Sequence, residues 1–420
     1  MKRSLFPSLT GGTIKAIASK SVAHRLLICA AFAQEESVIR CEEINEDIAA
    51  TVRCLEAIGA SIRRDGPFYK ITPIRKPQTG ATLDCGESGS TLRFLVPVAC
   101  MLGLDASFQM AGRLPLRPLS PLREELERNG VTLSPQDSNP LTVRGALQAT
   151  DFHIAGNVSS QFISGLLFAI AVSGKTGNIW IEGSLESAPY LDLTANALNQ
   201  FGIEVIRHES RLEIRTNRGL HSPGEVSVEG DWSNAAFPLC LGVIGKEPVT
   251  VFGISPSSRQ GDRAVLSLLR EFGARIFENG DSVTASPSSL HGISIDASQI
   301  PDLVPVLATV ASIARGQTVI HHASRLRLKE SDRLRAVSSV LNALGASVTE
   351  TDDGLIIEGV PFLQGGEADS FGDHRIAMSV AIASVCCKDT VILHGADATA
   401  KSYPGFWQDV TSLGLISSEL

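Results

Sequence analysis

A segment ending in Leu-x-x-x-Gly recurs along the chain, and each copy is followed by two short stretches in which apolar and polar residues alternate. The first copy reads LEAIGASIRRDGPFYKI and the fifth reads LNALGASVTETDDGLII. The repeat glycines are spaced about 71 residues apart; they are Gly59, Gly130, Gly202, Gly273 and Gly345, and a shortened sixth copy ends at Gly414. This spacing predicts that the chain consists of six copies of one structural unit.

The residues before each repeat glycine have a helical spacing. In the first copy Ile48, Val52 and Leu55 recur at intervals of three and four, so they share one face of a helix. Glycine suits the position just after a helix end, because a positive φ costs it little. The alternating stretches that follow predict half-buried β-hairpins.

A second, more apolar helix is expected about forty residues before each repeat glycine. Its first turn is polar in every copy: SKSVAHRLL, ESGSTLRFL, NVSSQFISG, GDWSNAAFP, QIPDLVPVL and GDHRIAMSV. Helices this apolar are buried on nearly all sides. The pattern therefore predicts an α+β fold of six repeated βαβαββ units, in which buried parallel helices are surrounded by sheets.

Composition narrows the possible functions. The 420 residues are 43% hydrophobic and 20% charged, with a net charge of -8, which gives no chain-wide basic surface for nucleic acid or an anionic membrane. The longest apolar stretches fall short of the roughly 18 residues of a membrane span. MKRSLFPSLTGG lacks the apolar region of an export signal, and the eight cysteines show no CxxC spacing. We therefore expect a cytoplasmic protein with reduced thiols.

Several cations stand where a helix dipole disfavours them. Lys20, Arg25, Arg93, His374 and Arg375 lie in or near the first turns of the apolar helices, where free backbone N–H groups attract anions. A bound anion would compensate for this excess of positive charge. The Ser, Asp and Asn residues at the same helix starts have a simpler explanation, because they are the preferred N-cap residues.

At these residues the sequence resembles the enolpyruvyl transferases, and specifically the 5-enolpyruvylshikimate-3-phosphate synthase family. The motifs follow in the family's order between Gly12 and Phe406: KSVAHR, SGSTLR, LRP, SSQF, SAPY, IPD, LKESDR, DHR and AKSYP. Each string is weak alone, but their order on a sixfold repeat makes the resemblance specific. It implies transfer of the enolpyruvyl group of phosphoenolpyruvate to the 5-hydroxyl of shikimate 3-phosphate with release of phosphate, a step of aromatic amino-acid biosynthesis.

The resemblance also implies two sets of binding residues. Shikimate 3-phosphate would be held by Lys20, Ser21, Arg25, Ser159, Ser160, Gln161, Ser187, Tyr190, Asp302 and Lys329. Phosphoenolpyruvate would be held by Lys20, Gly89, Arg117, Gln161, Arg333, Arg375 and Lys401. Guanidinium groups suit a carboxylate and a phosphate, and a glycine lets the backbone approach a ligand closely.

The implied reaction is an addition followed by an elimination, which needs an acid and a base. The resemblance implies Asp302 as acceptor of the hydroxyl proton and Glu330 as proton donor to the methylene carbon, with Lys20 or His374 assisting. Without the resemblance, Asp302 is explained as a helix cap and Glu330 as a partner of nearby arginines. No cofactor or metal is expected, since the histidines show no HExxH-like spacing and Arg and Lys can bind the phosphates.

Two positions depart from the family pattern. Glu87 in GESGST stands where many members have asparagine, and Arg325 replaces an amide that is common there. Glu87 places a carboxylate near the expected phosphoenolpyruvate site. Both departures concern the details of ligand contact rather than the reaction.

Three other functions compete with this interpretation. UDP-N-acetylglucosamine enolpyruvyl transferase has a cysteine in the loop that here reads GRLPLRPL, whereas this chain has none between Met101 and Leu239. A DNA sliding clamp would spread basic residues along helix faces, and an RNA 3′-phosphate cyclase would need a nucleophilic histidine, for which His374 is a poor candidate. GESGST also lacks the lysine of a P-loop.

The repeat count agrees with two lobes of three units each. Residues 1–15 and 230–420 would form a C-terminal lobe with the phosphoenolpyruvate and catalytic residues, and residues 16–229 an N-terminal lobe that binds shikimate 3-phosphate. The complete site would then require the lobes to close. The expected partners are the two small-molecule substrates, without nucleic acid or membrane, and the protein is expected to be a monomer.

Overall fold

The computed structural model describes residues 1–8, 10–216 and 219–420. The chain divides into two compact units, each with its own hydrophobic core. Ala18–Val228 form the N-terminal unit, and Met1–Ile17 together with Glu229–Leu420 form the C-terminal unit. Among the described residues, no helix is long and apolar enough to cross a membrane.

The N-terminal unit contains three four-stranded sheets, with the orders β14-β3-β5-β4, β6-β7-β9-β8 and β10-β11-β13-β12. Their strands are β3 (Ser37–Arg40), β4 (Ser61–Asp65), β5 (Phe68–Thr72), β6 (Thr82–Asp84), β7 (Ser107–Gln109), β8 (Thr132–Leu133), β9 (Leu141–Arg144), β10 (Asp151–Ala155), β11 (Gly177–Glu182), β12 (Glu204–Arg207), β13 (Arg211–Arg215) and β14 (Glu225–Ser227). Its helices are α1 (Lys20–Ala31), α2 (Glu46–Ile58), α3 (Gly89–Met101), the 3₁₀ helix η1 (Leu114–Leu116), α4 (Leu122–Arg128), α5 (Ser160–Ser173) and α6 (Ala188–Gln200). The apolar helices α3 and α5 pack on each other in the core.

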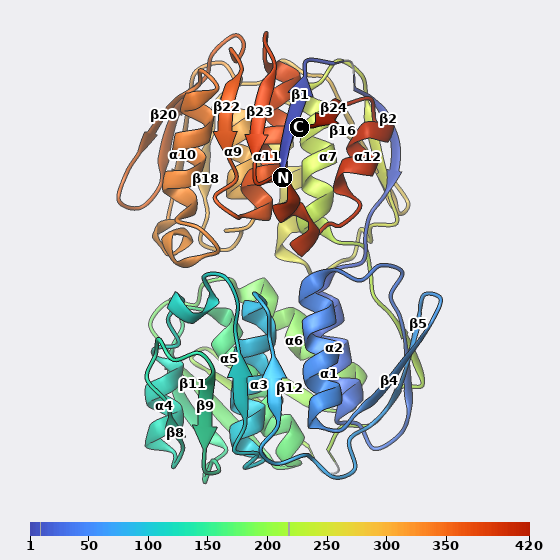
Figure 1. Cartoon of the computed structure of the whole chain (residues 1–420), viewed down its shortest axis with the longest axis vertical. Coiled ribbons are helices and arrows are strands. Elements are labelled where there is room, and N and C mark those ends of the chain that lie inside the picture. The colour runs from blue at the N-terminus through green and yellow to red at the C-terminus, as the bar shows by residue number, and fades with distance from the viewer. Residues whose placement is uncertain (9, 217–218) are drawn as a thin grey trace. The chain divides into compact units, whose positions relative to one another are not determined.

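The C-terminal unit repeats this arrangement, with the sheet orders β2-β15-β17-β16, β18-β19-β21-β20 and β22-β23-β1-β24. Its strands are β1 (Lys2–Phe6), β2 (Gly12–Lys15), β15 (Val249–Phe252), β16 (Arg275–Asn279), β17 (Ser282–Ser286), β18 (Ser294–Asp296), β19 (Gln317–His321), β20 (Ser347–Glu350), β21 (Leu355–Glu358), β22 (Gly366–Asp369), β23 (Val391–His394) and β24 (Ile416–Glu419). Its helices are α7 (Trp232–Ile244), η2 (Gly261–Ala264), α8 (Val265–Glu271), α9 (Val304–Ala311), η3 (Ser324–Leu328), α10 (Arg333–Ala343), α11 (His374–Ala383), η4 (Ser384–Cys386), η5 (Ala396–Lys401) and α12 (Phe406–Ser412). Helices α7, α9 and α11 pack on one another inside the unit (Figure 1).

The sheet register explains why the chain passes twice between the units. Strand β2 pairs in parallel with β15 of the C-terminal unit, although the helix that follows it, α1, belongs to the N-terminal unit. Conversely, β14 pairs in parallel with β3 of the N-terminal unit, and the following α7 belongs to the C-terminal unit. Two repeats have thus exchanged their first strands, and each exchange requires one crossing of the chain.

The N-terminus completes the shortened sixth repeat. Strand β1 takes the place of the second hairpin strand in this repeat by pairing antiparallel with both β23 and β24. The six repeat glycines all have a positive φ, as their predicted position at helix ends requires. The predicted α+β fold of six repeated units is confirmed.

Candidate active site

One buried guanidinium group joins three carboxylates in the C-terminal unit. Arg333 is the first residue of α10, and its side chain is 1% exposed. Its Nη1 donates to Oδ1 of Asp302 at 2.8 Å, its Nη2 to Oε2 of Glu330 at 2.8 Å and its Nε to Oδ2 of Asp373 at 2.8 Å. A planar guanidinium with fixed donor directions sets the spacing of these three carboxylates.

Asp302 lies in a strongly cationic environment and does not cap a helix. Helix α9 begins after Leu303, which makes no side-chain cap. Nη2 of Arg375 donates to Oδ2 of Asp302 at 3.1 Å, and Nζ of Lys329 lies 3.9 Å from its Oδ1. Burial raises the pKa of Asp302, but Arg375, Lys329 and Arg333 outweigh it and hold this pKa well below the usual range. Asp302 is therefore a carboxylate, as a proton acceptor must be.

The remaining predicted residues of this unit lie around the same cluster. Nζ of Lys401, near the end of η5, is 4.0 Å from Oε1 of Glu330. Burial lowers the pKa of Lys329 to about 8, against the opposing effect of Asp302. His374 is buried at the start of α11, with its Nδ1 3.7 Å from Oδ1 of Asp373.

Two aspartates of this unit were not predicted as site residues. Asp373 caps α11 by accepting from the backbone N–H of Arg375 at 2.9 Å, and it also pairs with Arg333. The sequence signal that could have identified Asp373 as a site residue was its position in the DHR motif. Asp262 is buried and accepts from Ser233; burial and the negative charge of Asp302 raise its pKa to about 6. The segment around Asp262 carries no comparable motif.

In the N-terminal unit, Lys20 is held by a carboxylate from the neighbouring helix. It is the first residue of α1, and its Nζ lies 2.9 Å from Oδ2 of Asp47 in the first turn of α2. Ser19, the N-cap of α1, makes no side-chain cap bond. Asp47 was missed because an acidic residue in a first helical turn is sufficiently explained by the helix dipole.

Arg25 lies in the core of the same unit. Its Nε donates to Oγ1 of Thr194 at 2.8 Å, its Nη1 to the Ser21 carbonyl at 2.6 Å and its Nη2 to the Tyr190 carbonyl at 3.0 Å. Its guanidinium lies over the ring of Phe94, 5.0 Å from the centroid. Burial lowers the pKa of Arg25 to about 10, so it stays charged at neutral pH. The contacts tie Ser21 on α1 to Tyr190 on α6.

A third group gathers at the start of α3. A Cβ placed on Gly89 would lie 2.8 Å from Nη1 of both Arg117 and Arg93. Nη1 of Arg93 donates to Oε1 of Gln161 at 2.9 Å, and Nε2 of Gln161 donates to Oγ of Ser90 at 2.9 Å. The structure thus brings Gly89, Arg117 and Gln161 together and adds Arg93, which the family motifs did not single out as a ligand.

The predicted serines occupy two helix starts. Ser159 caps α5, its Oγ accepting from the backbone N–H of Gln161 at 3.3 Å, and Ser160 is the first residue of that helix. Ser187 precedes α6 with a φ of 53° and makes no side-chain cap bond. A left-handed φ is uncommon for serine and marks a position that the surroundings constrain.

The two departures from the family pattern have different surroundings. Glu87 is exposed, and its side chain lies against Gly112, where an added Cβ would clash with its Oε1. Arg325 donates from Nη2 to the carbonyl of Ser298, in the segment that leads to Asp302. Arg325 therefore holds the backbone of the segment that precedes the candidate catalytic residue Asp302.

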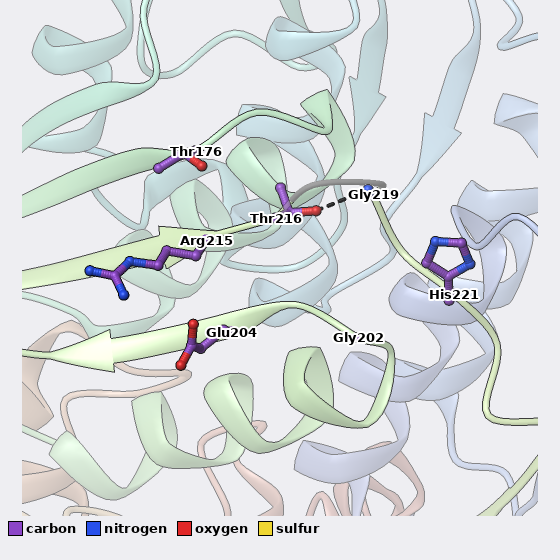
Figure 2. Close-up of a pocket in the computed structure, with 7 residues that line it drawn as sticks. All are labelled: Thr176, Gly202, Glu204, Arg215, Thr216, Gly219 and His221. Atoms are coloured by element: carbon purple, nitrogen blue, oxygen red, sulfur yellow. Dashed lines mark hydrogen bonds between the residues drawn. The ribbon is translucent and has the colours of Figure 1, made fainter.

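A separate cavity of about 660 Å³ lies at the edge of β12 and β13 (Figure 2). It is lined by Thr176, Gly202, Glu204, Arg215, Thr216, Gly219 and His221. None of the predicted site residues belongs to this lining. Within the described ranges, the one group of three side chains that could hold a metal ion is Asp296, His321 and His322, and it too contains none of them.

Comparison with solved structures defines the class of the fold. The chain matches an EPSP synthase from Acinetobacter baumannii with a TM-score of 0.82 and 24% identity, covering 100% of both chains. It matches the enolpyruvyl transferase NikO from Streptomyces tendae with a TM-score of 0.78 and 19% identity, covering 99% of this chain and 98% of that one. The fold is that of the enolpyruvyl transferases.

Sequence comparison identifies the family within this class. Residues 7–410 match the family model of EPSP synthase (3-phosphoshikimate 1-carboxyvinyltransferase). A 3-phosphoshikimate 1-carboxyvinyltransferase of Clostridium perfringens is 42% identical over 412 residues, which is 97% of each chain. One of Clostridium acetobutylicum is 40% identical over 414 residues, covering 97% of this chain and 96% of the relative. The chain belongs to the EPSP synthase family, and the resemblance deduced from the sequence motifs is confirmed.

Proposed function

We propose that this protein transfers the enolpyruvyl group of phosphoenolpyruvate to the 5-hydroxyl of shikimate 3-phosphate and releases phosphate. The observation that carries the proposal is the cluster in which Arg333 holds Asp302 and Glu330, in a chain that matches the EPSP synthase family over residues 7–410. One carboxylate is fixed as a base, and the second lies beside it on the same guanidinium. An addition followed by an elimination needs such a pair.

In the addition, the 5-oxygen forms a bond to C2 of phosphoenolpyruvate while C3 gains a proton. Asp302 takes the hydroxyl proton and Glu330 delivers the proton to C3, assisted by Lys20 or His374. In the elimination, the bond from C2 to the phosphate oxygen breaks and C3 returns a proton to the Glu330 carboxylate. Arg333, Arg375 and Lys401 bind the carboxylate and phosphate of phosphoenolpyruvate, where they stabilise the charge that leaves with phosphate.

The N-terminal unit supplies most of the shikimate 3-phosphate site in this proposal. The proposed ligands are Lys20, Ser21, Arg25, Ser159, Ser160, Gln161, Ser187 and Tyr190, with Asp302 and Lys329 from the C-terminal unit. Gly89, Arg117 and Gln161 join Lys20 in binding phosphoenolpyruvate. Contacts within the N-terminal unit support these assignments. Arg25 connects Ser21 with Tyr190, and Gly89 lies against Arg117.

We further propose that the enzyme works in the cytoplasm as a monomer and needs neither a cofactor nor a nucleic-acid or membrane partner. The family resemblance supports the compartment. Light scattering on the purified protein tests the monomer directly, and a mass of twice the chain's 44.6 kDa would contradict it.

The function is tested by phosphate release from phosphoenolpyruvate with the purified protein. Three reactions are compared, with shikimate 3-phosphate, with UDP-N-acetylglucosamine and without an acceptor. We expect release only with shikimate 3-phosphate. Release only with the nucleotide sugar would indicate the other enolpyruvyl transferase, and no release with either acceptor would refute the enzymatic proposal.

Gly89→Ala is expected to raise KM for phosphoenolpyruvate about tenfold, equivalent to about 1.4 kcal/mol of binding. The added methyl group would lie 2.8 Å from the guanidinium ends of Arg93 and Arg117 and must displace them. Both are ends of flexible side chains, so the melting temperature should change little. Gly405→Ala is the control, because its Cβ meets no atom closer than 3.9 Å; equal KM values in the two variants would contradict the proposal.

Lys329 is expected to make substrate capture depend on pH near 8. Its pKa is lowered to about 8 by burial, so below this pH it is an ammonium group and above it a neutral amine. kcat/KM for shikimate 3-phosphate, which reports ionisations of the free enzyme, should therefore fall as the pH rises through about 8. In Lys329→Arg the cation persists to much higher pH, and the falling limb should move with it. A limb that stays at the same pH in this variant assigns the ionisation to another group.

A further inference from the structure

Asp296, His321 and His322 form a cluster of ligand atoms outside the candidate active site. Asp296 is the last residue of β18 and His321 the last of β19, and they are partners in the parallel register of these strands. His322 follows with a φ of 55°, which turns the chain so that its imidazole faces the same point. Asp296 and His322 are exposed, with side-chain exposures of 53% and 60%.

The distances in this cluster are those of ligands around one metal ion. Nδ1 of His322 lies 3.2 Å from Oδ2 of Asp296 and 3.2 Å from Nδ1 of His321. Two ligand atoms about 2.1 Å from one ion at a tetrahedral angle are themselves about 3.4 Å apart. All three ligand atoms lie within 4.8 Å of one another, so one ion can reach each of them with small rotations.

Hydrogen bonding alone explains this arrangement less well. The carboxylate of Asp296 is an acceptor, so the proton between it and His322 lies on Nδ1 of His322. Nδ1 of His321 must then accept from the same N–H group, and three electron-rich atoms share one proton. A divalent cation in place of that proton would satisfy all three lone pairs.

We propose that Asp296, His321 and His322 bind a divalent transition-metal ion, with water completing its coordination. Two imidazoles and one carboxylate are ligands for Zn²⁺ and its neighbours in the first transition row, whereas Mg²⁺ and Ca²⁺ prefer oxygen ligands alone. The backbone N–H of His322 donates to Asp353 at 2.8 Å, which fixes the turn that carries the second imidazole.

The ion would join two strand ends that lead into the candidate active site. The chain after Asp296 reaches Asp302 within six residues, and the chain after His322 passes through η3 to Lys329. Arg325 already links these segments by donating to the Ser298 carbonyl. Bound metal would add a second link and restrict the motion of both segments.

The test measures zinc binding to the purified chain, freed of any affinity tag and kept under a non-thiol reductant, by equilibrium dialysis and by the shift in melting temperature. The wild-type protein is expected to bind one Zn²⁺ and to melt at a higher temperature with zinc, because a ligand of the native state stabilises it. His321→Gln and His322→Asn should each lower the affinity by about tenfold or more. Asparagine tolerates the positive φ at position 322, so the second variant keeps the turn.

His394→Ala is the matched control. His394 ends β23 in the same unit, and its Nε2 lies 3.0 Å from Glu367, a histidine paired with a single carboxylate. This variant should bind zinc as tightly as the wild type. The proposal is overturned if the wild type binds no zinc, or if the two cluster variants retain the affinity of the His394 variant.

Discussion

Replacing Asp302 by asparagine is expected to lower kcat for enolpyruvyl transfer by about 100-fold to 10,000-fold, the usual contribution of a positioned proton acceptor. Asparagine keeps the shape of the side chain but cannot accept the proton of the 5-hydroxyl. The pKa of Asp302 is held well below its usual range by Arg375, Lys329 and Arg333. The wild-type group is thus ready to accept a proton throughout the neutral pH range. Steady-state phosphate release with saturating substrates measures the change.

The fold should survive this substitution, which makes the kinetic loss interpretable. Arg333 keeps its bonds to Glu330 and Asp373 in the variant. Asp281→Asn is the control, because Asp281 lies on an exposed turn of the same unit and should keep wild-type kcat. If the Asp302→Asn enzyme has native near-ultraviolet circular dichroism and an undiminished kcat, Asp302 is not the base.

The periodic pattern was sufficient to predict the repeated unit but not how two of the units are assembled. Leu-x-x-x-Gly and the alternating stretches after it are local signals, and each of the five complete copies produced a helix followed by a hairpin. The exchange of β2 and β14 between the units depends on pairings between residues 237 and 187 positions apart, as in Gly12 with Val249 and Val38 with Glu225. Nothing in these short strands themselves specifies such a partner, since three or four residues fit many sheet edges.

The residues of the candidate site were also only partly predictable from the sequence. The motifs located Asp302, Glu330 and Arg333. In the structure the guanidinium of Arg333 donates to the carboxylates of the other two. Asp47 and Asp262 were missed because both look ordinary in sequence: one suits a helix start, and the other is a single acid in a loop. Their importance comes from burial beside Lys20 and Asp302, which is a property of packing. The helix caps illustrate the reverse case, because Ser159 and Asp373 proved to be caps as well as motif residues.

Replacing Arg333 by methionine is expected to destabilise the C-terminal unit by about 3–5 kcal/mol, the usual cost of removing one partner from a buried ionic group. The variant leaves the carboxylates of Asp302, Glu330 and Asp373 without the guanidinium that now contacts all three. Methionine fills a similar volume, so the loss would come mainly from uncompensated charge. Urea unfolding followed by tryptophan fluorescence measures the change, and Arg335→Met, two residues further along the same helix and exposed, should stay within about 0.5 kcal/mol of the wild type.

The pH dependence of this loss distinguishes charge from packing. In the wild type the pKa of Asp302 is depressed in the folded state, so its contribution to stability is present at neutral pH and is lost as the pH falls through the acidic range. Without Arg333, the pKa of Asp302 in the folded state is depressed less, so the variant has less of this contribution to lose on acidification. The difference in unfolding free energy between wild type and variant should therefore narrow as the pH falls from about 5 to about 3. A difference that stays constant over this range would show that Arg333 acts through its packing, and the three carboxylates would then owe their positions to other contacts.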